Sequence, residues 1–135
     1  MLFDVASVWP MVNPRYPESV AIIDDEEPMR EALLDLLDEA GLPACAFASA
    51  EEFLESGRQY VCSCLITDIR MPGISGLDLQ ARLNAARFRI PIIFITAHGD
   101  ERMRAQALRA GALGFLAKPF DDEMLILTVR AALER

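Results

Sequence analysis

The sequence predicts an α/β domain in which helices cover both faces of a parallel sheet. From Ser19 onward, five short apolar segments of strand length alternate with segments of helical pattern. The apolar segments lack the regular polar alternation of half-exposed strands, as expected for strands covered on both faces. Right-handed crossovers between parallel strands place the intervening helices on the two faces. A domain of five βα units in a row is therefore expected.

Each strand is predicted from a short run rich in β-branched or other apolar residues. A short buried strand is recognised from a short apolar run with turn-forming residues at each end. The weakest of the five runs is PACAF, because alanine and proline have little preference for strands. The five predicted strands are 20–24 (VAIID), 43–47 (PACAF), 63–68 (SCLITD), 91–96 (PIIFIT) and 113–117 (LGFLA).

The helices between the strands carry recognisable end signals. Pro28 fits a first helical turn, and Gly41 fits the position just after the end of the same helix. Ser49 and Glu52 have the spacing of a capping box. Each of the other three predicted helices follows a residue whose side-chain oxygen can accept a hydrogen bond from a free backbone N–H. These residues are Ser75 before 76–86, Asp100 before 101–110 and Asp121 before 122–135.

Residues 1–18 differ from the rest of the chain. Pro10, Pro14 and Pro17 lack a backbone N–H and fix φ, so no regular element continues through them. We expect an N-terminal extension, 1–18, that is flexible or is laid on the surface by Trp9 and its apolar neighbours. Residues 19–135 form the single domain.

Composition narrows the class of protein. The chain of 135 residues is 53% hydrophobic and 25% charged, an ordinary globular balance. Its net charge of −8 argues against direct nucleic-acid binding and favours metal cations or a basic protein partner. No run has the length of a signal peptide or membrane span. Cys45, Cys62 and Cys64 do not form a disulfide framework, which indicates a cytoplasmic protein.

Polar residues follow four of the predicted strands. Asp24 and Asp25 end the first strand, Asp68 the third and Thr96 the fourth, and Lys118 follows the fifth. Lys118 is the only lysine beside twelve arginines. Considered alone, Asp25 could equally well be a turn or helix-cap residue, and Lys118 could be a solvated cation on the surface. Because carboxyl ends of parallel strands meet at one edge, we expect all five side chains to converge there.

Such a cluster needs a cation. Two carboxylates about 5 Å apart repel by about 3 kcal/mol at an effective dielectric of about 20. Mg²⁺ is the most suitable ion, because it binds one or two carboxylates together with phosphate oxygens. Lys118 and Thr96 suit phosphoryl oxygens as a point charge and a hydrogen-bond donor. Asp68 stands apart from the acidic pair and is the better candidate nucleophile, which gives an acyl phosphate.

Four segments together resemble the receiver domain of two-component response regulators. They are IIDDEEPMR (22–30), LITDIRMPGISGLDL (65–79), FITAHGD (94–100) and AGALGFLAKPF (110–120). The resemblance runs from about Ser19 to the C-terminus. DIRMPGISG and TAHGD are most similar to FixJ-type receivers, which are commonly followed by a DNA-binding helix-turn-helix.

The resemblance implies a flavodoxin-like (βα)5 fold, a doubly wound parallel sheet with strand order 2-1-3-4-5. It also implies that Asp68 is the phosphoacceptor. Asp25, Asp68 and the backbone carbonyl of Arg70 would bind Mg²⁺ directly, and Asp24 would bind it through water. The implied activity is self-phosphorylation and self-dephosphorylation only, so the domain is not an enzyme acting on other substrates.

The resemblance also implies a phosphorylation switch. Thr96 and Lys118 would hold the phosphoryl group, with a cis Lys118–Pro119 bond. Thr96 would move toward that group and Phe115 would turn inward, although Phe115 alone also fits a permanently buried aromatic. The surface of helix 101–110, strand 113–117 and helix 122–135 would change as a result.

The implied partners are a sensor histidine kinase, an output domain or target protein, and a second copy bound through that switching surface. Arg70 and His98 occupy positions that tune water access in similar receivers. His98 itself is more simply a surface loop residue, because neither metal-ligand nor catalytic-base spacing surrounds it.

Two other functions fit parts of the sequence. A haloacid-dehalogenase-like phosphatase also uses an aspartate nucleophile, but it needs a D-x-D motif after the first strand, where Asp24 and Asp25 are adjacent. An interaction module with the receiver fold and no phosphorylation is the third reading.

Overall fold

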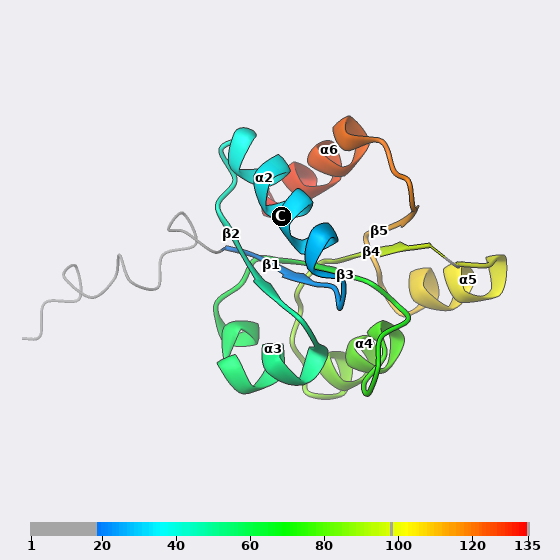
Figure 1. Ribbon diagram of the computed structural model, residues 1–135. Coiled ribbons are helices and arrows are strands. Elements are labelled where there is room, and N and C mark those ends of the chain that lie inside the picture. The colour runs from blue at the N-terminus through cyan, green and yellow to red at the C-terminus, as the bar shows by residue number, and fades with distance from the viewer. Residues whose placement is uncertain (1–18, 98, 135) are drawn as a thin grey trace, which may run out of the picture.

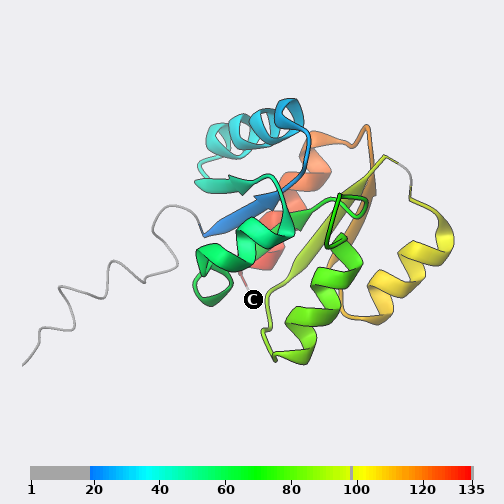
Figure 2. The same ribbon diagram turned by 60° about the horizontal axis from the view of Figure 1, so that its bottom comes forward.

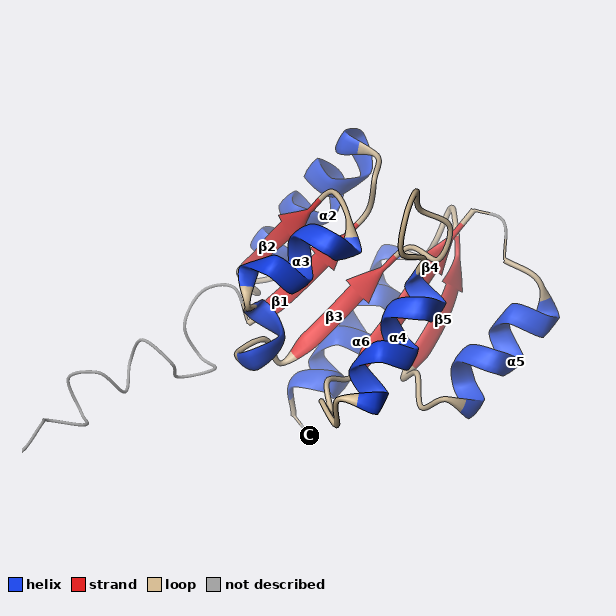
Figure 3. Cartoon of the chain, turned by 90° about the horizontal axis from the view of Figure 1, so that it is seen from below, coloured by secondary structure: helices blue, strands red, loops and turns tan. Residues whose placement is uncertain are grey.

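The computed structural model describes residues 19–97 and 99–134. The expectations for the extension 1–18 and for His98 lie outside the described residues. One parallel sheet has the order β2-β1-β3-β4-β5, as expected (Figure 3). Its strands are β1 (Val20–Ile23), β2 (Ala44–Phe47), β3 (Cys64–Thr67), β4 (Ile92–Thr96) and β5 (Gly114–Ala117).

Helices cover the sheet on both faces (Figures 1 and 2). One face carries α2 (Glu27–Glu39) and α6 (Asp122–Leu133). The other carries α3 (Ala50–Ser56), α4 (Gly76–Ala85) and α5 (Glu101–Arg109). A short 3-10 helix, Arg58–Tyr60, joins α3 to β3 and was not predicted. Within the described residues, the helices are too short or too polar to cross a membrane.

The core is divided by the sheet into two apolar layers. Leu33 and Leu37 of α2 pack with Leu125 and Val129 of α6 on one side. On the other side, α3, α4 and α5 pack against Phe94 and its neighbours. The inner strands β1, β3 and β4 are completely buried, whereas the edge strands β2 and β5 are half-buried or exposed. Edge position explains why the PACAF run has so weak a strand pattern.

The predicted capping residues and the glycine after α2 are confirmed, whereas α4, α5 and α6 end one or two residues before their predicted carboxyl ends. Gly41 follows α2 with φ +76, a conformation that favours glycine. Each of the other four helices begins at the expected cap. The Ser49 hydroxyl accepts a hydrogen bond from the Glu52 N–H at 3.1 Å. The Glu52 carboxylate accepts one from the Ala48 N–H at 3.2 Å, not from the Ser49 N–H. The capping box therefore reaches one residue further back than its usual form.

Strand register brings the functional residues to one edge. Ile23 pairs with Thr67 and Thr96 pairs with Ala117, so the residues that follow these strands emerge side by side. The Asp68 N–H donates to the Ile23 carbonyl at 3.0 Å, and the Lys118 N–H donates to the Thr96 carbonyl at 2.9 Å. The ladder hydrogen bonds thus extend into the site itself. The Lys118–Pro119 peptide bond is cis, as expected.

Candidate functional site

Three carboxylates lie together at the carboxyl edge of the sheet. One oxygen from each of Asp24, Asp25 and Asp68 falls within 4.8 Å of the others. Asp24 and Asp68 are buried and Asp25 is exposed. Hard oxygens at this spacing, open to solvent on one side, fit a divalent cation that keeps part of its water shell.

Lys118 lies between the two buried carboxylates. Its Nζ donates to Asp24 Oδ2 at 3.0 Å and to Asp68 Oδ2 at 3.1 Å. The Glu26 carboxylate is 3.7 Å from the same ammonium but remains largely exposed. Lys118 therefore offsets part of the repulsion between the Asp24 and Asp68 carboxylates.

Burial and pairing act in opposite directions on these groups. Desolvation raises the pKa of Asp24, and hydrogen bonds from the Glu26 N–H and from Lys118 only partly oppose it. For Lys118 desolvation lowers the pKa, but the hydrogen bonds and charges of Asp24 and Asp68 together outweigh it, so the pKa is raised. The raised pKa keeps the Lys118 ammonium charged, and a cation bound beside Asp24 would oppose the rise in the pKa of that carboxyl.

Asp68 is held in place by backbone groups. Its Oδ1 accepts from the Ile69 N–H at 2.6 Å and from the Arg70 N–H at 3.3 Å. Those bonds leave Oδ2 beside Lys118. Behind it, α4 begins at Gly76, where an added Cβ would collide with the Asp68 carbonyl oxygen. Only glycine lets α4 start this close, so the helix and the carboxylate are positioned together.

Thr96 and Phe115 meet at a third residue, Gly99. Thr96 is buried at the end of β4, and Phe115 is half-buried with its ring centroid 6.4 Å from that of Phe94. A Cβ on Gly99 would lie 2.6 Å from Thr96 Cγ2 and 2.9 Å from the Phe115 ring. Thr96, Gly99 and Phe115 therefore form one packed contact.

The side chains surround a small pocket of about 240 Å³, which we call the strand-end pocket. It is lined by Asp25, Glu26, Asp68, Arg70, Thr96, Ala97 and Lys118. Asp24 adjoins it through Lys118, whereas Phe115 does not line it. Glu26 and Ala97 were not predicted as site residues, although Glu26 directly follows the acidic pair Asp24 and Asp25 in the sequence. The Arg70 guanidinium extends to Met103 of α5, with Nη2 3.9 Å from Sδ.

The chemistry available is that of an anion held beside a cation. Asp68 offers an oxygen nucleophile, and Lys118 and Thr96 flank the space in front of it. Acceptance of an electrophilic group by the Asp68 carboxylate suits this arrangement.

Comparisons with known proteins agree with this geometry. Residues 20–130 match the response regulator receiver domain family. Nodulation protein W of Bradyrhizobium diazoefficiens is 47% identical over 116 residues, which are 86% of this chain and 51% of that protein. The transcriptional regulatory protein FixJ of Azorhizobium caulinodans is 46% identical over 121 residues, 88% of this chain and 57% of that protein. The chain spans about half the length of these curated relatives.

Solved structures have the same architecture. The structure of FixJ-N aligns with a TM-score of 0.78 at 38% identity and covers 89% of this chain and 96% of that one. The response regulator StyR aligns with a TM-score of 0.79 at 44% identity and covers 85% of this chain and 58% of that one. With motifs, strand order and relatives in agreement, the chain belongs to the receiver domain family of response regulators and is FixJ-like within it.

Proposed function

We propose that this domain accepts a phosphoryl group on Asp68 and thereby switches a signalling surface. The observation that carries the proposal is the joint hydrogen bonding of Lys118 to Asp24 and Asp68 at adjacent strand ends. An isolated surface lysine or a capping aspartate needs no such arrangement. Receiver domains of this kind interact with histidine kinases and output domains.

In the transfer step, an Asp68 oxygen forms a bond to phosphorus. The P–N bond of a kinase phosphohistidine breaks, and its electron pair remains on the imidazole nitrogen. Backbone N–H groups of Ile69 and Arg70 hold the other oxygen, so the carboxylate needs no reorientation. Lys118 and Thr96 then bind the new phosphoryl oxygens as a charge and a hydroxyl donor.

The residues present also fit Mg²⁺. Asp24, Asp25 and Asp68 have carboxylate oxygens close enough to share one ion. As the family resemblance implies, Asp25, Asp68 and the backbone carbonyl of Arg70 would hold it directly, and Asp24 through water. The ion supplies neutralisation of the phosphoryl and carboxylate charge. Lys118 already holds two of these acids together, so the chain's own contribution is a site preassembled for the ion.

The proposed switch uses the contact of Thr96, Gly99 and Phe115. When the Thr96 hydroxyl turns toward the phosphoryl group, the space behind it becomes available to the Phe115 ring. Phe115 belongs to β5, between α5 and α6, so its movement would alter the α5–β5–α6 surface. One new dianion with its hydrogen bonds biases this two-state element. The same surface is the proposed contact for a second copy.

The proposed partners are a sensor histidine kinase and an output domain or target protein. The named relatives are about twice as long as the aligned region, and one is called a transcriptional regulatory protein. We propose that this receiver likewise controls an output without binding nucleic acid itself, and that it works in the cytoplasm.

Intact mass measurement tests the function. With Mg²⁺ and acetyl phosphate, wild type should gain a single labile phosphoryl adduct, and both EDTA and Asp68→Asn should abolish it. An adduct that persists in Asp68→Asn would place the nucleophile elsewhere. A wild-type protein that gains none would support the phosphorylation-independent interaction module.

A further inference from the structure

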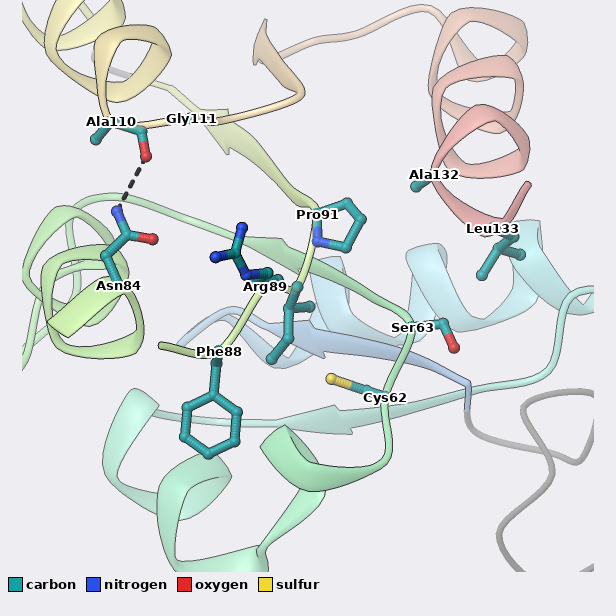
Figure 4. Close-up of a pocket in the computed structure, with 11 residues that line it drawn as sticks. Cys62, Ser63, Asn84, Phe88, Arg89, Pro91, Ala110, Gly111, Ala132 and Leu133 are labelled. Atoms are coloured by element: carbon teal, nitrogen blue, oxygen red, sulfur yellow. Dashed lines mark hydrogen bonds between the residues drawn. The ribbon is translucent and has the colours of Figure 1, made fainter. Parts of the chain in front are cut away.

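A second pocket lies at the opposite edge of the sheet, where strands begin (Figure 4). Its volume is about 520 Å³. We call it the amino-edge pocket, and it shares no lining residue with the strand-end pocket. The connections before β3, β4 and β5 and the carboxyl ends of α4, α5 and α6 form it: Cys62, Ser63, Asn84, Phe88, Arg89, Ile90, Pro91, Ala110, Gly111, Ala132 and Leu133.

The lining of the amino-edge pocket combines apolar side chains with two solvent-exposed polar groups, those of Asn84 and Arg89. Phe88 is fixed by an edge-on contact with Tyr60, with ring centroids 5.0 Å apart. Asn84 Nδ2 donates to the Ala110 carbonyl at 3.0 Å, and Figure 4 shows its oxygen facing the pocket. The exposed Arg89 guanidinium has no ion-pair or hydrogen-bond partner among residues 19–97 and 99–134. The pocket thus offers a fixed acceptor and an unpaired cation.

The chain enters the domain at the rim of this pocket. The Ser19 carbonyl accepts from the Ser63 N–H at 2.6 Å and from the Cys64 N–H at 3.3 Å. Ser63 is itself part of the lining. The eighteen residues before Ser19 are therefore tethered beside the amino-edge pocket. Ten residues lead from Ser19 back to Trp9, a span of up to about 33 Å when the chain is extended.

The segment before Ser19 is rich in apolar residues. It carries only three charged side chains, Asp4, Arg15 and Glu18. Its three prolines reduce the entropy lost on ordering. Its large apolar residues are Leu2, Phe3, Val5, Val8, Trp9, Met11, Val12 and Tyr16. Burial of such side chains is favourable, and the tether supplies an effective concentration in the millimolar range.

We propose that residues 1–18 dock into the amino-edge pocket of their own domain, with Trp9 as the anchor. The indole ring packs between the Phe88 and Leu133 walls and against the Arg89 guanidinium, a favourable cation–π pair. Its N–H donates to Asn84 Oδ1, the acceptor that a buried tryptophan requires. The docked segment joins the ends of α4, α5 and α6. The inference does not depend on phosphoryl transfer.

Fluorescence of the full chain tests the proposal, because Trp9 is its only tryptophan. Wild-type emission should be blue-shifted from that in denaturant and protected from acrylamide quenching. Arg89→Glu should shift the emission to the red and increase quenching. Arg87→Glu is the matched control: it lies in the same α4–β4 connection, is exposed and does not line the pocket. It should leave both readouts unchanged.

Amide spectra of wild type and Trp9→Ala identify where the indole binds. The proposal expects the largest shift differences at Ser63, Arg89, Gly111 and Leu133. Wild-type emission equal to that in denaturant, or shift differences confined to other surfaces, would overturn it. Emission that changes with protein concentration would also overturn it, because the segment would then occupy a second copy.

Discussion

The Lys118 ammonium lies 3.1 Å from Asp68 Oδ2, across 50 residues of sequence. The same nitrogen is 3.0 Å from Asp24 Oδ2. One lysine therefore holds two strand-end carboxylates together that would otherwise repel each other. A point charge with three donors can bridge oxygens from two strands, whereas the planar guanidinium of arginine favours a single carboxylate. This gives a physical reason for the one lysine in a chain whose other cations are arginines.

Removing this bridge should make stability depend on magnesium. Lys118→Met keeps the volume of the side chain but leaves two buried carboxylates without a nearby positive charge. We expect the free energy of unfolding in EDTA to fall by about 3 kcal/mol. Added Mg²⁺ should restore part of it. Urea titrations with EDTA and with Mg²⁺ measure both values.

Glu26→Gln is the control for that substitution. Glu26 is only 3.7 Å from the ammonium, but its side chain is 66% exposed, so solvent screens the pair. We expect little change in stability. Equal losses for Lys118→Met and Glu26→Gln would contradict the assignment of Lys118 as the bridge.

Gly99→Ala should hinder the proposed switch. The new methyl would lie 2.6 Å from Thr96 Cγ2 and 2.9 Å from the Phe115 ring, so the loop must move. We expect a loss of about 1 kcal/mol in stability and a smaller change of the Phe115 resonances on phosphorylation. Aromatic NMR spectra with and without acetyl phosphate report the change. If the Phe115 resonances of this variant change on phosphorylation as much as in wild type, the Thr96–Gly99–Phe115 contact is not part of the switch.

Gly76→Ala should disturb Asp68 from behind. Its Cβ would collide with the Asp68 carbonyl oxygen and lie 3.0 Å from Ile69 Cα, both backbone atoms that cannot rotate away. We expect a stability loss of about 1–3 kcal/mol together with slower phosphorylation by acetyl phosphate. Chemical denaturation and time-resolved intact mass give the two quantities. Destabilisation with an unchanged phosphorylation rate would show that α4 does not position the carboxylate.

The three free cysteines should be unreactive in the folded state. Burial raises the pKa of Cys45 to about 11 and those of Cys62 and Cys64 to about 12. Little thiolate forms at neutral pH, so alkylation should be slow until the protein unfolds. Alkylation followed by mass spectrometry, with and without urea, measures this difference.

The same shifts predict how stability responds to alkali. Because the folded-state pKa values exceed the unfolded value of 9.0, the buried thiols contribute fully to the free energy of unfolding below pH 9.0. This contribution should be lost as the pH rises through the folded-state pKa values. A free energy of unfolding that stays constant above pH 9.0 would contradict the burial of these thiols.

Periodicity and helix caps predicted most of the fold because each depends on local sequence. The buried strands, the caps at Ser75 and Asp100, and Gly41 all follow from patterns within a few residues. The alternation of strands and helices then fixes parallel pairing. Because parallel strands end at one edge, it also predicts that Asp68, Thr96 and Lys118 meet. The strand order came from the family resemblance, since alternation alone allows several.

Side-chain geometry could not be predicted in the same way. Whether Lys118 bridges Asp24 and Asp68 depends on rotamers and on a register set by long-range pairing. The approach of Arg70 to Met103, 33 residues away, depends likewise on how α5 packs. The 3-10 helix at Arg58–Tyr60 lacks a strong local signal. These features arise from tertiary packing, which local patterns do not record.

The most direct measurement of the central claim is chemical trapping of the phosphorylated residue. Borohydride reduces an acyl phosphate to the alcohol, which converts a phosphorylated aspartate into homoserine. After treatment with acetyl phosphate and Mg²⁺, peptide mass spectrometry should find homoserine at position 68 and at no other acid. Homoserine at position 24 or 25, or none in a protein that carries the adduct, would contradict the account.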